Sequence, residues 1–206
     1  MECIVTRNEQ EKDYHRTEEL VRNAFWNVYR PGCTEHYILH CLRDNPVFVQ
    51  ELDLVLERSG EIIGQIAYTY SKINCSDGRE VPTMTFGPVC IAPNYQRRGY
   101  GKQLIQSSMI LAKEHGAGAI AITGNFEFYK KIGFVQAKEK GILYAEDPSA
   151  NYFLIKELVP GYLDGVSGSF RDPEGYSVFE RDPIGFEQYE KSFPVREKLK
   201  LPGQLF

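Results

Sequence analysis

The segment 96–102 holds two glycines and three cationic side chains. It follows an apolar, β-branched stretch that ends at Pro93, and the apolar spacing of an amphipathic helix begins directly after it. We therefore expect a strand, a tight loop and a helix N-terminus, whose unpaired backbone N–H groups attract anions. Glycine lets the backbone approach a ligand closely, and arginine or lysine adds positive charge. This chemistry predicts a pyrophosphate site at Arg97, Arg98, Gly99, Gly101 and Lys102.

Two common phosphate-binding loops do not fit this segment. A Walker A loop has the pattern Gly-x-x-x-x-Gly-Lys-Ser/Thr. Here Gln96 stands in the place of its first glycine, and Gln103 stands where the magnesium-binding hydroxyl is needed. A dinucleotide fingerprint has the pattern Gly-x-Gly-x-x-Gly, and its third glycine is replaced by Leu104. Both nucleotide motifs therefore lack side chains that they require.

The segment instead resembles the acetyl-CoA-binding motif of the GNAT acetyltransferase superfamily. That motif reads Gln/Arg-x-x-Gly-x-Gly/Ala and follows a strand that ends in Val-x-Ile-x-Pro. The matching residues are Val89, Ile91, Pro93, Gln96, Gly99 and Gly101. The resemblance implies that the strand and the loop bind acetyl-CoA as a cosubstrate, through Val89, Cys90, Ile91, Gln96, Arg97, Arg98, Gly99, Tyr100, Gly101 and Lys102.

The resemblance covers about residues 6–158 and implies both a fold and a reaction. The fold is of the α/β (α+β) class, a GNAT acyl-CoA N-acyltransferase fold with a mixed, mostly antiparallel central sheet and helices on both faces. The reaction is transfer of the acetyl group of acetyl-CoA to a primary amine by direct attack. The acceptor is an unidentified small molecule or peptide. A catalytically silent acyl-CoA-binding or regulatory module on the same fold remains the alternative.

The dipeptide Gly87-Pro88 interrupts the strand pattern just before the motif. Proline donates no hydrogen bond to a strand ladder, and glycine favours a bulge, so we expect irregular pairing and exposed amides around residues 89–91. In the resembling family the pantetheine arm of the cofactor lies in an opening beside this strand. The backbone N–H near Cys90 is our candidate donor to the oxyanion. The Cys90 thiol itself is interpreted as a small packing group rather than a nucleophile.

A second match to the family lies at Thr123–Phe134, where a short helix ends in the pattern Tyr-x-x-x-Gly-Phe. Tyr129 occupies the tyrosine position, and many relatives use this tyrosine to protonate the departing thiolate. A phenol is a proton donor at neutral pH, and coenzyme A leaves as a thiolate that needs a proton. The resemblance makes Tyr129 the candidate general acid, with packing against the cofactor as the alternative. It also suggests cofactor contacts from Asn125 and Phe128.

A general base is missing from the place where several relatives carry one, because residues 84–91 contain no carboxylate. Glu35, His36, His40 and Glu127 are candidates by residue type alone. His36 and His40 are four residues apart on one predicted helix face, but a third metal ligand would be poorly directed. We therefore expect no metal, and we interpret both histidines as structural or substrate-facing.

The aromatic run at 25–32 lies between the first two predicted helices. In the resembling fold these helices and their connection form a wall of the acceptor site. Trp26, Tyr29 and Arg30 are therefore weak candidates for substrate binding, with plain packing as the alternative.

Composition narrows the class of protein further. The chain has 206 residues and a net charge of −4 with mixed charges, which argues against nucleic acid as a partner. No apolar run approaches the roughly 20 residues that span a bilayer, and the amino terminus lacks the pattern of a signal peptide. Five cysteines without a Cys-x-x-Cys pair indicate reduced thiols. We expect a cytoplasmic protein with no membrane partner, and we leave a homodimer open.

Periodicity predicts the elements that must position these groups. Helices are expected at 12–27 and 34–43, after Gly101 and at 126–131, and strands at 3–6, 52–56, 62–70, 81–92, 119–123, 134–137 and 152–158. Residues 1–158 are predicted to form the GNAT acetyltransferase domain. Residues 159–206 are rich in Gly, Pro, Asp and aromatic side chains, and are expected to form an ordered C-terminal extension packed on the domain or on a partner subunit, with a short helix near 185–192.

Overall fold

The computed structural model describes residues 3–205. The backbone divides into two compact units, each assembled from separate stretches of the chain. The division passes through β3 (Glu61–Cys75), β4 (Glu80–Ile91) and α3 (Tyr100–Glu114) rather than through a linker. Unit 1 holds the described residues up to Ala67, Gly87–Ile105 and the residues from Glu174 onward, and unit 2 holds Tyr68–Phe86 and Gln106–Pro173.

The strands of unit 1 follow the order β1-β2-β3-β4. The pairs β1–β2 and β2–β3 are antiparallel, with Thr6 opposite Leu56 and Leu54 opposite Ile66. Alternation of leucine with charged residues predicted the second of these strands, and its leucines are buried as that pattern requires. The strands span Ile4–Asn8 (β1), Leu54–Arg58 (β2), Glu61–Cys75 (β3) and Glu80–Ile91 (β4).

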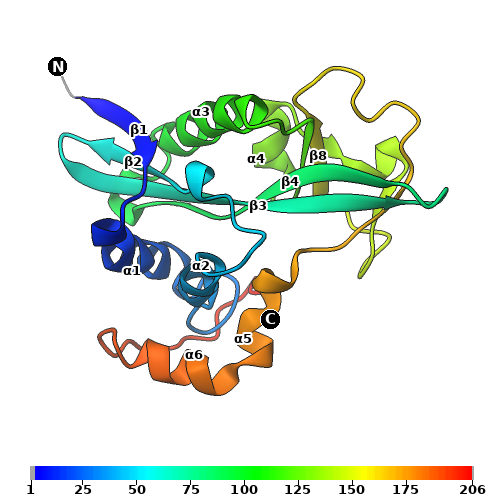
Figure 1. Ribbon diagram of the computed structural model, residues 1–206. Helices are drawn as coiled ribbons and strands as arrows, with labels where there is room; N and C mark the ends of the chain where they lie inside the picture. The colour runs from blue at the N-terminus through cyan, green and yellow to red at the C-terminus, as the bar shows by residue number, and fades with distance from the viewer. Residues whose placement is uncertain (1–2, 206) are drawn as a thin grey trace. The chain divides into compact units, whose positions relative to one another are not determined.

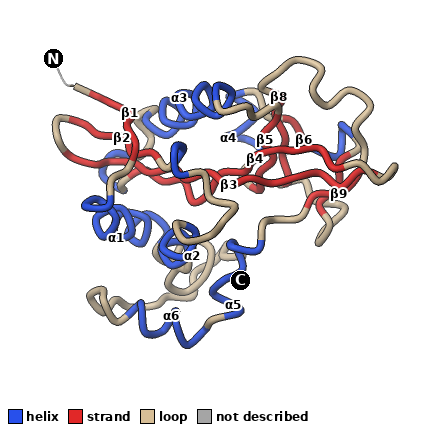
Figure 2. The backbone as a smooth tube through the Cα atoms, viewed as in Figure 1, coloured by secondary structure: helices blue, strands red, loops and turns tan. Residues whose placement is uncertain are grey.

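Helices α1 (Tyr14–Phe25) and α2 (Glu35–Leu42) pack together and cover one face of these strands (Figure 1). Only the first residues of α3 (Tyr100–Glu114), up to Ile105, belong to unit 1. They are drawn on the other side of the strands (Figure 2). Each fully buried aliphatic side chain contributes roughly 1.5–3 kcal/mol to such a core. The cluster under α1 and α2 consists of Leu20, Val21, Leu39, Val55, Ile62, Ala67 and Cys90.

A buried ionic cluster also joins α1 and α2 to the strands. The Arg43 guanidinium lies among Glu9, Glu18 and Asp53, with Nη2 3.0 Å from Glu9 Oε2 and Nε 3.6 Å from Asp53 Oδ2. Burial, together with the hydrogen bond to Glu9, raises the pKa of Asp53 to about 9. The raised pKa favours the neutral form of Asp53, which lowers the uncompensated negative charge of the cluster.

Unit 2 adds a parallel strand and a second antiparallel group. Its strand order is β3-β4-β5-β8-β6, and β9 pairs with both β3 and β7. β5 runs parallel to β4, and β8 runs antiparallel to β5 and β6. The mixed, mostly antiparallel sheet expected from the sequence is confirmed. These strands span Ala119–Thr123 (β5), Val135–Gln136 (β6), Ile142–Tyr144 (β7), Phe153–Glu157 (β8) and Gly168–Phe170 (β9).

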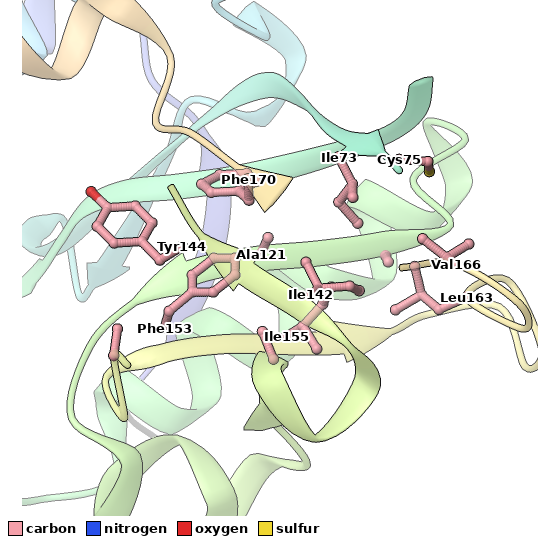
Figure 3. Close-up of a cluster of buried hydrophobic side chains, with 13 residues drawn as sticks. Ile73, Cys75, Ala121, Ile142, Tyr144, Phe153, Ile155, Leu163, Val166 and Phe170 are labelled. Atoms are coloured by element: carbon pink, nitrogen blue, oxygen red, sulfur yellow. The ribbon is translucent and has the colours of Figure 1, made fainter. Parts of the chain in front are cut away.

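The core of unit 2 lies between β5, β8 and the short strands β7 and β9 (Figure 3). The rings of Phe153 and Phe170 stack with their centroids 5.0 Å apart, and Ile142 and Ile155 lie beside them. The sequence did not predict β7 or β9. Each has three residues, too few to show a period, and each is held by pairing with a segment distant in the chain.

The C-terminal part of unit 1 forms α5 (Val178–Arg181) and α6 (Pro183–Glu190) beside α2 (Figure 1). The Asp182 side chain caps α6 by accepting the Gly185 N–H at 2.9 Å, and it also accepts the Tyr37 hydroxyl at 2.8 Å. α6 overlaps the helix expected near 185–192. The predicted boundary between a domain at 1–158 and an extension at 159–206 stays a prediction.

The remaining helices are short. α4 spans Phe126–Tyr129. Among residues 3–205, no helix combines the length and apolar character needed to cross a membrane. The 3₁₀ helices are η1 (Glu11–Asp13), η2 (Gln50–Leu52), η3 (Pro93–Tyr95), η4 (Lys130–Ile132), η5 (Ala137–Lys140) and η6 (Glu174–Ser177).

Candidate functional site

The loop after β4 turns sharply into α3. Two positive φ angles, +61° at Arg97 and +90° at Gly99, redirect the chain between η3 and Tyr100, the first residue of α3. The Gly99 carbonyl accepts the Gln103 N–H at 3.0 Å, which places Gly99 at the helix N-cap. Glycine adopts this backbone conformation at little cost. A Cβ on Gly99 would meet no atom within 4 Å, so the surface above this residue is open.

This helix end concentrates positive charge. The first amides of α3, those of Tyr100, Gly101 and Lys102, have no carbonyl partner within the helix, as at any helix N-terminus. The side chains of Arg97, Arg98 and Lys102 are exposed. Partial charge from the helix and full charge from the side chains therefore occur together in unit 1, in an arrangement that favours a phosphate group.

A side-chain hydrogen bond of Gln96 connects the loop to the preceding strand, β4. The side-chain amide of Gln96 donates to the Ile91 carbonyl at 3.0 Å. Nearby, the Tyr95 hydroxyl donates to Glu61 at 2.7 Å, and the Arg98 guanidinium lies 5.9 Å from the centre of the Tyr95 ring. Gln96 thus has a structural contact that the sequence did not suggest, and its predicted contact with the cofactor stays a prediction.

The strand stretch 89–91 approaches β3 closely. A Cβ on Gly64 would lie 2.6 Å from Ile91 Cδ1 and 3.2 Å from the Cys90 carbonyl oxygen, so β3 needs glycine at this position. The Cys90 side chain points into the core under α1 and α2. Burial raises the pKa of the Cys90 thiol, which keeps it neutral. This environment supports packing rather than nucleophilic chemistry for Cys90.

The Gly87-Pro88 break does not end β4, which continues through it to Ile91. On its unit 2 side, the described register between β4 and β5 consists of Met84 opposite Ile120. This pair lies before the break, so the irregular pairing expected at residues 89–91 stays a prediction.

In unit 2 a short helix follows β5 directly. Asn125 is its N-cap, and the side-chain oxygen of Asn125 accepts the Phe128 N–H at 3.2 Å. Phe128 is 40% exposed and Asn125 is also exposed, so both side chains are open to solvent. The predicted cofactor contacts of these two residues stay predictions.

Tyr129, the last residue of α4, is only 9% exposed. Its ring centroid lies 5.0 Å from that of Phe128, 5.4 Å from that of Phe134 and 6.1 Å from that of Phe86. A Cβ on Gly124 would come within 2.5 Å of the Tyr129 ring, so glycine at 124 is required for the ring to lie against the backbone. The ring is therefore held in a fixed position in unit 2.

Known proteins are similar to this chain in sequence and in fold. Residues 44–136 match the family model described as the acetyltransferase (GNAT) domain. This part of the chain is similar to a GNAT acetyltransferase domain. The matched part includes β4, the loop 96–102, α3, β5 and α4, so the predicted cofactor loop and Tyr129 both lie inside it.

Similar proteins match most of the length of the chain. The uncharacterized N-acetyltransferase YhbS of Escherichia coli (strain K12) is 21% identical over 162 residues, which are 79% of this chain and 92% of the relative. A crystal structure of E. coli YhbS in complex with CoA superposes with a TM-score of 0.74 at 22% identity, covering 84% of this chain and 92% of that one. A GNAT acetyltransferase of Brucella melitensis in complex with acetyl-CoA has a TM-score of 0.67 at 23% identity, with 84% and 98% covered. These structures confirm the expected GNAT fold.

The four candidate bases have different environments. His36 is fully buried, with Nε2 donating to Glu190 at 2.8 Å, and His40 lies 3.0 Å from Glu18. Glu127 pairs with Lys130 at 2.6 Å on the surface. The Glu35 carboxylate accepts the Thr34 N–H at 2.9 Å, and burial raises the pKa of Glu35.

A raised pKa brings Glu35 closer to the range useful for a general base, and its role stays a prediction. Residues 3–205 contain no group of three or more His, Cys, Asp or Glu side chains placed to hold a metal ion.

The three candidate acceptor residues precede residues 44–136, which match the family model, and they contact residues near the C-terminal end of the chain. The Trp26 indole donates to the Glu197 carbonyl at 3.0 Å, and the Arg30 guanidinium lies 4.8 Å from the centre of the Phe179 ring. Tyr29 is 42% exposed, and its carbonyl accepts the Leu205 N–H at 2.9 Å. No local sequence pattern predicts these contacts, because the partners lie about 150–175 residues away in the chain. Substrate binding by the three residues remains untested.

Proposed function

We propose that the protein transfers the acetyl group of acetyl-CoA to the primary amine of a small molecule or peptide. The observation that carries the proposal is the helix N-terminus of α3, where an open glycine at φ +90° lies among three exposed cationic side chains. This end provides what the pyrophosphate of coenzyme A requires. The proposal is supported by solved relatives of the same fold, which were crystallised with CoA and with acetyl-CoA.

The loop 96–102 would hold the pyrophosphate through the first amides of α3 and the side chains of Arg97, Arg98 and Lys102. The backbone of Val89, Cys90 and Ile91 would bind the pantetheine arm, and the Cys90 N–H would donate to the oxyanion as it forms. Asn125 and Phe128 are assigned to cofactor binding by the resemblance alone. Trp26, Tyr29 and Arg30 are assigned to the acceptor side.

The chemical step is direct attack of the neutral amine nitrogen on the acetyl carbonyl carbon. Collapse of the tetrahedral intermediate breaks the carbon–sulfur bond, and the thiolate of CoA takes a proton from the phenol of Tyr129. The attacking nitrogen loses one proton to a base, for which Glu35 is the candidate with a raised pKa. Solvent then returns a proton to the Tyr129 phenolate and takes one from the protonated base. The products are the acetamide and CoA, so atoms and charge balance without a covalent enzyme intermediate.

Calorimetric titration with acetyl-CoA, CoA and ATP tests the first part of the proposal. We expect saturable binding of both CoA species and none of ATP, followed by amine-dependent release of thiol in a screen of amines. Absence of CoA binding would show that the loop is a positively charged helix N-terminus without a cofactor-binding role. Binding without thiol release from any amine would favour the catalytically silent acyl-CoA-binding module.

Tyr129→Phe is expected to lower kcat about 100-fold, the usual size of a general acid's contribution, while the Kd for acetyl-CoA changes less than about twofold. The ring contacts with Phe86 and Phe134 remain in this variant, so the fold is retained. Steady-state thiol release and calorimetry measure the two quantities. Tyr144→Phe is the control, because Tyr144 is a similarly buried tyrosine in a different cluster of unit 2. Full activity of Tyr129→Phe would show that Tyr129 has a packing role and is not the general acid.

A further inference from the structure

The C-terminal segment Glu174–Arg181, which consists of η6 and α5, reaches β4 in unit 1. It lies outside the residues that match the family model. We propose that Tyr176 of this segment is a positioning residue that holds the acyl-CoA-binding stretch of β4, residues 88–91, in its binding conformation. This inference rests on the proposed function and assigns the C-terminal segment a part in the same site.

The contact is a specific hydrogen bond at the point where β4 is irregular. The Tyr176 hydroxyl donates to the Gly87 carbonyl at 3.1 Å, and its ring edge would be 3.4 Å from a Cβ on Gly87. Pro88, the next residue, has no N–H to offer a strand ladder. A side chain from 89 residues further along the chain therefore satisfies the carbonyl at the break in the strand.

The other end of the stretch is held in a comparable way. The Gln96 side chain donates to the Ile91 carbonyl at 3.0 Å, and the Ala92 N–H donates to the Ile63 carbonyl at 2.8 Å. Residues 88–91 are thus fixed before Pro88 by Tyr176 and after Ile91 by the loop. Fixing both ends prearranges the backbone groups of this stretch, which lowers the entropy cost of binding a ligand along them.

Tyr176 can perform this task because its own segment is fixed. Gly175 packs so closely on α2 that a Cβ would lie 2.4 Å from Leu42 Cδ2. Arg181 pairs with Glu174 at 3.0 Å within the segment, and Phe179 lies under the guanidinium of Arg30. The segment therefore has contacts with β4, with α2 and with the connection between α1 and α2, all within unit 1.

The test compares Tyr176→Phe with Tyr162→Phe in the full chain. Tyr162 provides a matched control, because its hydroxyl also donates to a carbonyl of β4, that of Pro82, at 2.8 Å. Calorimetry measures Kd for two probes, acetyl-CoA and adenosine 3′,5′-bisphosphate, which has the nucleotide end of CoA without the pantetheine arm. For Tyr176→Phe we expect the Kd for acetyl-CoA to rise about fivefold to tenfold, the usual effect of one lost hydrogen bond. The Kd for the bisphosphate should stay unchanged, and Tyr162→Phe should alter neither value.

The outcomes separate this inference from the proposed function. Failure of the wild-type protein to bind acetyl-CoA would overturn both. If the wild-type protein binds, but Tyr176→Phe and Tyr162→Phe behave alike, only the positioning role is overturned. An equal loss of affinity for both probes would also overturn it, because that result indicates a general change in the fold rather than a displaced strand.

Discussion

The double variant Arg98→Glu with Gly99→Val is expected to lower the affinity for acetyl-CoA at least ~100-fold, beyond detection by calorimetry. Reversing a charge beside a bound pyrophosphate replaces attraction with repulsion, worth about 1–3 kcal/mol for a charge-assisted contact. Valine at φ +90° is strained and also places a side chain where the ligand must approach the backbone. The two effects act on the same phosphate-binding surface, so together they remove the anion site.

A matched variant at the other end of α3 separates this effect from strain in the helix. Gly116 has φ +88°, a Cβ there would also meet no atom within 4 Å, and Lys113 is an exposed cation in the last turn. Lys113→Glu with Gly116→Val should lose stability to a similar extent but keep its affinity for acetyl-CoA. Equal affinities of the loop variant and the wild-type protein would contradict the assignment of the pyrophosphate to residues 96–102.

The sequence predicts those elements in which the apolar residues of one continuous segment show a clear period. β5 occupies the expected residues 119–123, and β4 differs from its expected range by one residue at each end. In both segments the apolar residues form an uninterrupted or alternating run between clear turn signals. The sequence also predicts the loop 96–102, since its glycines and cations lie within seven consecutive residues.

Contacts between distant segments were beyond the reach of these patterns. The Tyr176 to Gly87 bond joins residues 89 positions apart, and three-residue β9 is defined by its partners β3 and β7. His36 is a further case, because the sequence indicated a structural or substrate-facing side chain but not the residues that it contacts. The structure buries His36 completely and surrounds it with the rings of Phe186, Tyr189 and Phe193. The hydrogen-bond partners of such polar side chains are distant in the sequence and are identified from the three-dimensional structure.

Glu190→Gln is expected to destabilise the protein by about 3 kcal/mol at pH 7, the usual cost of breaking a buried ion pair. The Glu190 carboxylate accepts from Arg22 Nε at 3.1 Å and from His36 Nε2 at 2.8 Å. Arg22 is only 3% exposed, so the variant leaves a buried guanidinium without its carboxylate partner. Chemical unfolding measures the effect. Glu187→Gln, at an exposed position on the same helix, is the control and should change stability by less than about 0.5 kcal/mol.

The same pair makes part of the stability depend on pH. Burial alone would raise the pKa of Glu190, but its hydrogen bonds with His36 and Arg22 outweigh burial and lower the pKa to about 2. A carboxyl group whose pKa is lower in the folded state stabilises the fold above its unfolded pKa, and this contribution is lost as pH falls through the folded value. The stability difference between wild type and Glu190→Gln should therefore be full above about pH 5 and shrink toward pH 2. Unfolding curves at pH 7, 5 and 3 measure it, and a difference that stays constant with pH would show that Glu190 holds the C-terminal helix by packing rather than by its charge.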